Sequence, residues 1–158
     1  MTDKCNEGGC GCGAVRYRLT DDPIFVNICH CRLCQRQTGT ASAVNAFIET
    51  SQLQHLSGEL TEHEFGTGSG GTQVVIRCAV CGTPVWSHYS GLDRKAAAVR
   101  VGTLDDPSPV RPDAVIYTAH KLAWVALPEG IPEFDAYYAY AELLPPDRFN
   151  RLKSLLAQ

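Results

Sequence analysis

Seven of the eight cysteines in this 158-residue chain fall into three short clusters. Cysteines only two or three positions apart are poor disulfide partners for one another, but they are suitable ligands for one tetrahedral metal ion. The spacing therefore predicts a zinc protein in which two ions are held by the clusters Cys10/Cys12, Cys29/Cys31/Cys34 and Cys78/Cys81. The remaining cysteine, Cys5, stands alone near the N-terminus and is interpreted as a free thiol.

Charge and hydropathy argue against a secreted or membrane-spanning protein and against one that binds nucleic acid. No secretory signal follows Met1, and no segment approaches the ~20 apolar residues that span a membrane. We therefore expect a cytoplasmic protein, whose thiols are kept reduced. The formal net charge of -3 and the pI near 5.9 give no electrostatic reason to bind nucleic acid or an anionic membrane. A small molecule is the expected partner, and the oligomeric state is left open.

The hydrophobic pattern indicates one mainly β domain over residues 1–158. Apolar and polar residues alternate with period two, as in half-buried strands, and turn residues such as Gly58 and Pro107 separate the runs. Several short strands of this kind predict curled or packed sheets. The expected strands are 14–19, 24–28, 43–48, 62–65, 72–77, 85–89, 98–101 and 115–118.

A C-terminal helix is expected after Pro145 and Pro146, with Asp147 capping its first turn. Four apolar residues recur there at helical spacing, which indicates a face that covers the sheet. They are Phe149, Leu152, Leu155 and Leu156.

Glycines indicate the structure of two shorter segments. A short helix is expected from Arg32 to Gln37, because no helix breaker occurs before Gly39. The glycine-rich stretch 66–71 is interpreted as a hairpin loop and not as a phosphate loop, because a strand and not a helix follows it.

The Cys-x-x-Cys motif at Cys78 and Cys81 is typical of a metal-binding knuckle, and Gly82 supplies the backbone freedom that its turn needs. Cys10 and Cys12 can add two more thiolates. Four thiolates close a tetrahedral site, so we expect a structural zinc that joins the N-terminal loop to a hairpin in the middle of the chain.

The middle cluster is different, because Cys29, Cys31 and Cys34 offer three thiolates and leave the fourth corner of a tetrahedral ion open. An open corner is where metal chemistry takes place. Spacing alone also allows Cys31 and Cys34 to pair with the knuckle cysteines. His30 could also be a ligand, but it lies between two ligand cysteines, so we expect its side chain to point away from the ion and to support the site from behind or to face the surface.

The ordered cysteines and their neighbours make the chain resemble the glutathione-dependent formaldehyde-activating enzyme (GFA) family, whose domain is shared with centromere protein V. The resemblance covers about residues 8–135 and leaves 136–158 as a C-terminal extension with the helix. Its most specific blocks are Gly-Cys-Gly-Cys-Gly at 9–13, Cys-His-Cys-Arg-Leu-Cys at 29–34 and Cys-Ala-Val-Cys-Gly at 78–82. Further blocks are 101–107 and the segment from Trp124 to 134.

The resemblance implies a fold, two metal sites and an activity. The fold would be a small zinc-bound domain of packed, bent antiparallel sheets, sometimes called a β-tent. The structural zinc would be held by Cys10, Cys12, Cys78 and Cys81, and the catalytic zinc by Cys29, Cys31 and Cys34. The activity would be that of a carbon-sulfur lyase acting on S-hydroxymethylglutathione or a related thiol-aldehyde adduct, with glutathione as co-substrate.

Residues that would contact glutathione are less well marked. Its carboxylates call for cationic side chains near the motifs, and the candidates are Arg32, Arg36, Arg77 and Lys121. Aromatic residues at strand spacing, such as Trp86 and Tyr117, are interpreted as core more than as a pocket rim. The alternative to an enzyme is a non-catalytic zinc-binding interaction domain, or a sensor of metal or thiols.

Overall fold

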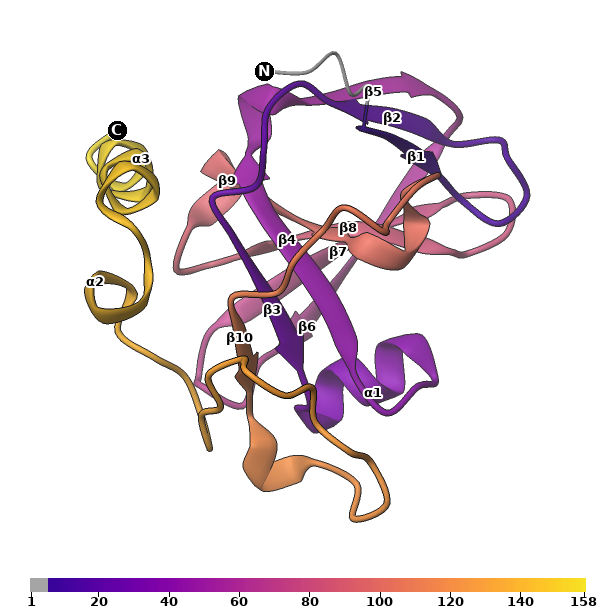
Figure 1. Ribbon diagram of the computed structural model, residues 1–158. Helices are drawn as coiled ribbons and strands as arrows, with labels where there is room; N and C mark the ends of the chain where they lie inside the picture. The colour runs from indigo at the N-terminus through magenta and orange to yellow at the C-terminus, as the bar shows by residue number, and fades with distance from the viewer. Residues whose placement is uncertain (1–5) are drawn as a thin grey trace.

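The structure, a computed structural model, describes residues 6–158 and is mainly β, as expected (Figure 1). Ten strands and three α-helices are found in this part of the chain. The strands are β1 (Asn6–Gly9), β2 (Arg16–Leu19), β3 (Phe25–Cys29), β4 (Ala43–Glu49), β5 (Leu53–Ser57), β6 (Leu60–Gly66), β7 (Thr72–Cys78), β8 (Pro84–Tyr89), β9 (Ala96–Arg100) and β10 (Ala114–Ile116). The helices are α1 (Arg32–Thr38), α2 (Tyr140–Leu143) and α3 (Pro146–Leu156).

The strands form two sheets. A three-stranded sheet has the order β1-β2-β5, and a seven-stranded sheet has the order β10-β3-β4-β9-β8-β7-β6. Every pairing is antiparallel except that of β10 with β3, which is parallel. The register shifts in β2 at Arg16/Tyr17 and in β7 at Ile76/Arg77, and such bulges bend a sheet.

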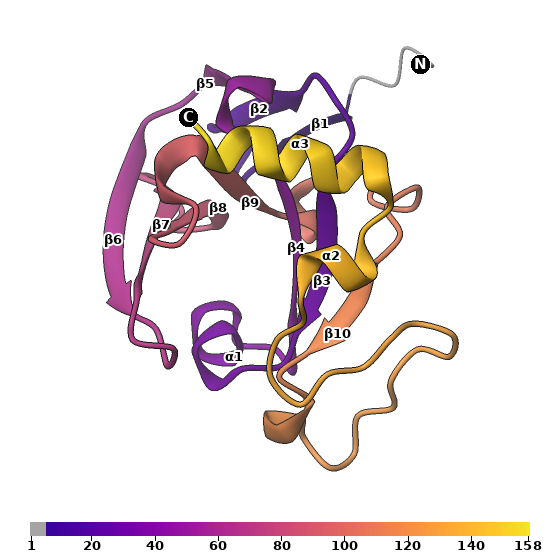
Figure 2. The same cartoon turned by 90° about the vertical axis from the view of Figure 1, so that its left-hand side faces the viewer.

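The large sheet is buried on both faces at its centre, which explains why β3 and β4 read as nearly continuous apolar runs. Val26 and Ile48 pack with Tyr17 in the core between the two sheets. The neighbouring Phe25 and Phe47 point to the opposite face, where they pack with Leu152 of α3. Figure 2 shows α3 lying across this face.

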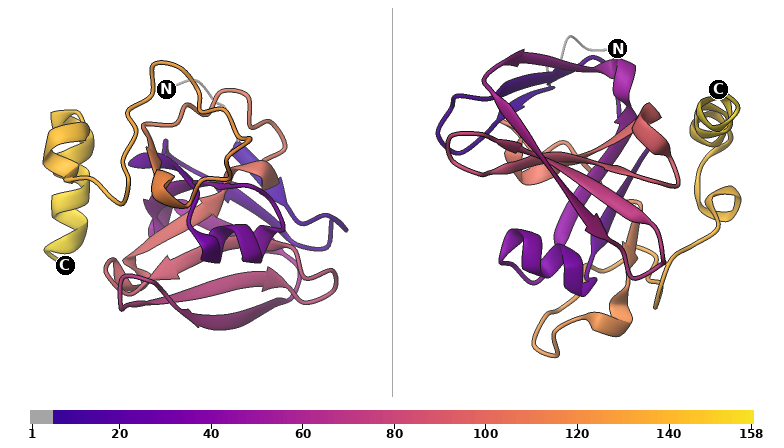
Figure 3. Two further views of the ribbon diagram at one scale, coloured as in Figure 1. Left: turned by 90° about the horizontal axis from the view of Figure 1, so that it is seen from below. Right: turned by 180° about the vertical axis from the view of Figure 1, so that it is seen from behind.

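Helix α3 is fixed to the sheet by two bidentate ion pairs as well as by its apolar face. Arg148 donates to both carboxylate oxygens of Asp113, at 2.9 and 2.8 Å. Arg151 donates to both oxygens of Glu49, at 3.0 and 2.6 Å. Because paired guanidinium-carboxylate geometry is specific, these contacts set where the helix lies along the sheet. Views from below and behind show α3 and α1 on different sides of the strands (Figure 3).

The expected C-terminal helix is present, but two details of it were wrong. Asp147 does not cap it: the N-cap is Pro145, no side chain caps the helix, and Asp147 lies inside the first turn, where a carboxylate suits the helix dipole. Leu156 is 49% exposed and does not share the buried face of Leu152 and Leu155. The short helix after Cys31 is confirmed as α1, and it ends at Gly39 in the left-handed conformation.

All eight expected strands are found, some displaced by one or two residues, and two strands were missed. Val101 begins a 3-10 turn, Val101–Thr103, and does not end β9. Strand β1 contains Gly8, at which a Cβ would lie 2.5 Å from the Thr103 carbonyl oxygen, so the strand needs a residue of low β propensity. Strand β5 is mostly exposed and lacks the apolar alternation that marks a strand. Cys5 lies outside the described residues.

Among residues 6–158, no helix has the length and apolar character needed to cross a membrane.

Candidate metal centres and the adjoining cavity

The four-cysteine cluster joins two loops that are far apart in the sequence. The Sγ atoms of Cys10, Cys12, Cys78 and Cys81 all lie within 4.8 Å of one another. Cys12 Sγ is 3.5 Å from Cys10 Sγ and 3.8 Å from Cys78 Sγ. Four sulfurs about 2.3 Å from a tetrahedral zinc lie about 3.8 Å apart, so this donor set fits zinc.

Backbone and hydroxyl groups hold the two loops in this geometry. Gly82, with φ +74°, turns the chain at the knuckle so that its N–H reaches the carbonyl oxygen of Cys78 at 2.9 Å. The hydroxyl of Thr83 accepts a hydrogen bond from the Gly11 N–H at 3.2 Å and lies 3.1 Å from Cys81 Sγ. That hydroxyl and nearby N–H groups lower the pKa of Cys81 to about 5, which favours the thiolate that metal binding requires.

The three-cysteine cluster is built by one strand end and one helix start. Cys29 ends β3, Cys31 is the N-cap of α1, and Cys34 lies in the first turn of that helix. Their Sγ atoms lie within 4.8 Å of one another, a spacing that fits three corners of a tetrahedral zinc. Cys29 and Cys34 are buried and Cys31 is half-buried.

Cys31 is the sulfur best prepared to be a thiolate. The thiols of Cys29 and Cys34 lower its pKa, and the backbone N–H groups at the start of α1 add to this effect. One of them, the N–H of Cys34, donates to Cys31 Sγ at 3.3 Å. The same sulfur contacts raise the pKa of Cys29, because adjacent negative charges are unfavourable.

The structure does not bring Cys31 and Cys34 to the knuckle cysteines, which rules out the other pairing that spacing allowed. His30 is buried and is not part of the three-cysteine cluster, so the surface position that we considered for it is wrong. In an extended backbone successive side chains point to opposite sides, so His30 points away from the side on which Cys29 and Cys31 lie. Burial lowers the pKa of His30, which favours the neutral ring.

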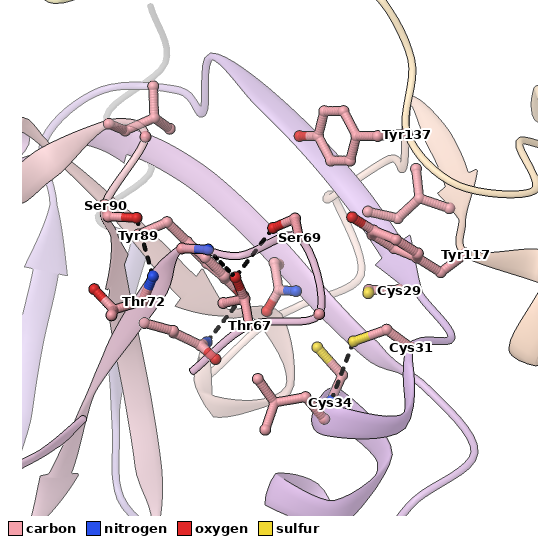
Figure 4. A pocket seen from close by; sticks show the side chains of 18 of the residues that line it. Cys29, Cys31, Cys34, Thr67, Ser69, Thr72, Tyr89, Ser90, Tyr117 and Tyr137 are labelled. Carbon is pink, nitrogen blue, oxygen red and sulfur yellow. Dashed lines mark hydrogen bonds between the residues drawn. The ribbon is translucent and has the colours of Figure 1, made fainter. Parts of the chain in front are cut away.

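All three cysteines of the middle cluster line a cavity of about 730 Å³. The four-cysteine cluster does not line it. Figure 4 shows hydroxyl-bearing side chains across the cavity from the sulfurs, on and beside the β6-β7 hairpin. They include Thr67, Ser69, Thr72 and Ser90. The glycine-rich stretch 66–71 is therefore the hairpin loop that we expected, and it also forms a wall of the cavity.

The wall nearest the sulfurs is aromatic. Tyr117 lies beside Cys29 in Figure 4, with a left-handed backbone at φ 54° that is unusual for an aromatic residue. Tyr137 and Tyr140 continue this wall, and their hydroxyl oxygens are 3.1 Å apart. Buried Asn27 donates to the Tyr137 hydroxyl at 3.1 Å and accepts from the Tyr138 hydroxyl at 2.8 Å, which fixes the segment against β3.

Comparisons with known proteins place the chain in a family. A sequence model of the glutathione-dependent formaldehyde-activating enzyme family matches residues 5–120. The chain belongs to this family. A crystal structure of a Rhodobacter sphaeroides protein from a structural genomics programme is similar, with 26% identity and a TM-score of 0.50 over 67% of this chain and 91% of that one. A comparison with curated proteins returned no match.

The GFA match contains both cysteine clusters but not the whole cavity. Tyr137, Tyr140 and Leu156 line the cavity and lie beyond residue 120. Sequence reasoning missed these three residues, and also Thr67 and Ser69, because none of them belongs to a motif. The sequence signal for this wall is the density of tyrosines in Tyr-Tyr-Ala-Tyr at 137–140.

Of the cationic candidates for glutathione binding, only Arg32 lines the cavity. Arg32 also shares a surface hollow with Arg36, beside Trp124. Arg77 donates to the Gly82 carbonyl at 3.0 Å, and Lys121 donates to backbone carbonyls of its own loop. Of the aromatic candidates, Trp86 is core as expected and Tyr117 is not, because it lines the cavity.

Proposed function

We propose that this protein is a zinc-dependent carbon-sulfur lyase that forms and cleaves the adduct between glutathione and formaldehyde or a related aldehyde. Membership of a family of formaldehyde-activating enzymes supports the reaction class. The observation that carries the proposal is that Cys29, Cys31 and Cys34 line the large cavity together. A metal held there would meet substrate, whereas a metal held by the four-cysteine cluster would be fully coordinated by protein.

The reaction requires little more than alignment of a sulfur with a carbon. In the forward direction the thiol sulfur bonds to the carbonyl carbon, the carbonyl π pair moves to oxygen, and the thiol proton ends on that oxygen. In reverse the carbon-sulfur bond breaks, and thiol and aldehyde are released. When bound by three cysteines, zinc supplies a Lewis-acid position that stabilises a thiolate or polarises a carbonyl oxygen.

The chain's own residues position the reactants. Three sulfurs from β3 and α1 fix one face of the metal site, and the cavity of about 730 Å³ has room for a tripeptide adduct. Arg32 at the rim offers a guanidinium to a glutathione carboxylate. The hydroxyl groups of Thr67 and Ser69 offer hydrogen bonds to the peptide groups of the substrate.

The test is the rate of exchange between formaldehyde, glutathione and their adduct, measured by exchange NMR with zinc-loaded protein. We expect acceleration above the uncatalysed rate, and loss of that acceleration in Cys31→Ser. The variant should keep its fold and the metal of the four-cysteine cluster, because Cys31 is remote from that cluster. Zinc content per chain is measured on the same samples.

A protein that binds two zinc ions without accelerating exchange would contradict the proposal and favour a metal or thiol sensor. A variant at Trp124, which is 78% exposed and does not line the cavity, serves as the matched control. Trp124→Ala should leave the exchange rate unchanged. Equal losses in Cys31→Ser and Trp124→Ala would show that the assay reports general damage and not the site.

A further inference from the structure

Six aromatic rings form a continuous band along the cavity wall, from β8 to the turn after β10. Neighbouring ring centroids are 5.8 Å apart for Tyr89 and Phe47, 4.3 Å for Phe47 and Phe25, and 5.1 Å for Phe25 and Tyr140. The band continues from Tyr140 to Tyr137 at 5.7 Å and to Tyr117 at 6.4 Å. We call this set the aromatic band. All of its members except Phe25 line the cavity.

The charges around the cavity are sparse. Among the lining residues, Arg32 is the one guanidinium, and no lysine, aspartate or glutamate occurs. Formaldehyde adds a single hydroxymethyl group to a thiol, and that group is small and polar. A hydroxymethyl group is too small and polar to pack on the aromatic band. An aromatic ring on the substrate, packed against the band, would remove a large apolar area from water.

We propose that the preferred substrates are thiol adducts whose aldehyde-derived part is a large apolar group, most favourably an aromatic ring, and that Tyr137 is a specificity-determining residue. This inference rests on the proposed lyase function. The cysteine sulfurs and Tyr117 lie close together, so a ring attached to the reacting carbon would reach the aromatic band directly (Figure 4).

Tyr137 and Tyr140 are well suited to select substrate because they come from outside the family match and are held in advance of binding. Their hydroxyl groups contact each other, and Asn27 of β3 donates to Tyr137. Tyr137 also stacks on Tyr138 with centroids 4.7 Å apart and planes 10° apart. A wall that is already ordered loses little entropy when a ring packs on it.

The test compares two stable thioethers, S-benzylglutathione and S-methylglutathione, by calorimetric titration of the zinc-loaded chain. Both carry the same tripeptide and neither can be cleaved, so the difference in affinity reports the apolar group alone. We expect the benzyl compound to bind about tenfold more tightly or better, as burial of a ring beside aromatic side chains predicts. Tyr137→Ala should remove most of that difference and leave S-methylglutathione binding unchanged.

Two variants separate the ring from other effects. Tyr137→Phe keeps the ring and should keep the preference, and Trp124→Ala, outside the cavity, should not change it. Equal affinity of the unmodified chain for the two thioethers would overturn the inference without any variant. If no adduct is accelerated but the benzyl compound still binds more tightly, the proposed lyase function fails, and what stands is the selectivity of the cavity for an apolar ring on a bound thiol.

An independent observation concerns a buried cation. Arg100 of β9 is 5% exposed, and within residues 6–158 no carboxylate lies within ion-pair distance of it. Its guanidinium donates to the neutral amides of Asn45 at 2.5 Å and Gln37 at 2.7 Å. A buried charge without a counter-charge is strongly unfavourable, so a negative group is expected near it.

The elements that carry the two amides also adjoin the three-cysteine cluster. Gln37 lies on α1 one turn after Cys34, and Asn45 lines the same cavity as Cys34. Arg100 pairs with Asn45 across β9 and β4, and Asn45 pairs with Asn27 of β3, two residues before Cys29. Three thiolates and one divalent ion carry a net charge of about -1, which a single guanidinium balances. We infer that Arg100 is the positioning counter-ion of a metal held by the three cysteines, which rests on the metal assignment above.

Chelator competition tests this role, with the four-cysteine cluster as an internal control. Arg100→Gln should weaken zinc binding at the three-cysteine cluster by about tenfold or more and leave the other cluster unchanged. Arg100→Lys, which keeps the charge, should keep most of the affinity. An equal loss at both clusters, or no loss at either, overturns the inference.

If Arg100→Gln does not fold, Gln37→Leu decides the question. This change removes one acceptor that orients the guanidinium but leaves the chain's charge unaltered. A lower zinc affinity confined to the three-cysteine cluster supports the counter-ion role, and unchanged affinity there overturns it.

Discussion

Single residues in this protein carry more than one function each. Cys31 caps α1 by accepting the Cys34 N–H, and the same sulfur faces the cavity as part of the three-cysteine cluster. Tyr117 has a left-handed backbone conformation, and its side chain lines the cavity. Strained or doubly used residues of this kind are common where chemistry needs a fixed geometry. Both residues lie at the junction between β3, α1 and β10.

His88 provides a prediction of pH dependence. Its ring is buried, and burial lowers its pKa below the ordinary value of 6.5, while a hydrogen bond of 2.8 Å between Nδ1 and the Ala96 carbonyl partly opposes this shift. The unfolded chain therefore binds the proton first as pH falls. Stability supplied by the neutral ring is complete above pH 6.5 and is lost as pH falls through the lower pKa of the folded state.

His88→Gln should flatten this dependence below pH 6.5, by at most about 1.4 kcal/mol per pH unit. Urea unfolding at a series of pH values measures it. His63→Gln, at an exposed position on β6, two strands from β8 in the same sheet, controls for the removal of a histidine as such. A parallel pH profile for His88→Gln and the unmodified chain would contradict the prediction.

At the scale of elements, strands with a strong apolar pattern were predictable and strands defined by their neighbours were not. Residues 72–77 alternate clearly and became β7, and the breaker Gly39 correctly ended α1. Strands β1 and β5 flank β2 in the small sheet, where pairing and not composition determines them. The face of α3 was predicted from spacing, but Leu156 at its end is half-exposed and lines the cavity, whereas Leu155 beside it is buried.

Helix α3 allows a matched comparison on one element. Leu152 is 1% exposed and packs with Phe25 and Phe47, so Leu152→Ala should reduce the free energy of unfolding by about 2–5 kcal/mol. Leu156→Ala, at a half-exposed position on the same helix, should cost less than about 1 kcal/mol. Denaturant titration measures both. Similar costs for the two variants would mean that α3 does not dock as described.

At the scale of the whole molecule, both cysteine clusters could be identified from the sequence, but the cavity that only the three-cysteine cluster lines could not. The clusters are local motifs of fixed spacing. The cavity is assembled from β3, α1, β4, the β6-β7 hairpin and the C-terminal segment, and such a surface depends on packing between segments that share no motif. Arg32 and Tyr137 line the same cavity although they are 105 positions apart in the sequence.

The two clusters should also differ in what they contribute to folding. The four-cysteine cluster links segments 66 residues apart, between Cys12 and Cys78, whereas the three-cysteine cluster lies within residues 29–34. Metal that closes a long loop restricts the unfolded chain more than metal that closes a short one, and its binding free energy then stabilises the tertiary fold. Loss of the first metal should therefore destabilise the domain, and loss of the second should not.

Cys81→Ser should accordingly lower the Tm of the zinc-loaded chain by about 10 °C or more, since about 1 kcal/mol corresponds to about 2–4 °C in a chain of this size. Cys31→Ser should change the Tm by no more than a few degrees, because only a local turn loses its ligand. Scanning calorimetry with zinc content determined on each sample measures both. The two variants remove one sulfur each, so they are matched in chemistry and differ in the length of chain that the metal closes. A large fall in Tm for Cys31→Ser, with the four-cysteine cluster still loaded with zinc, would contradict this prediction. It would show that the three-cysteine cluster also stabilises the fold.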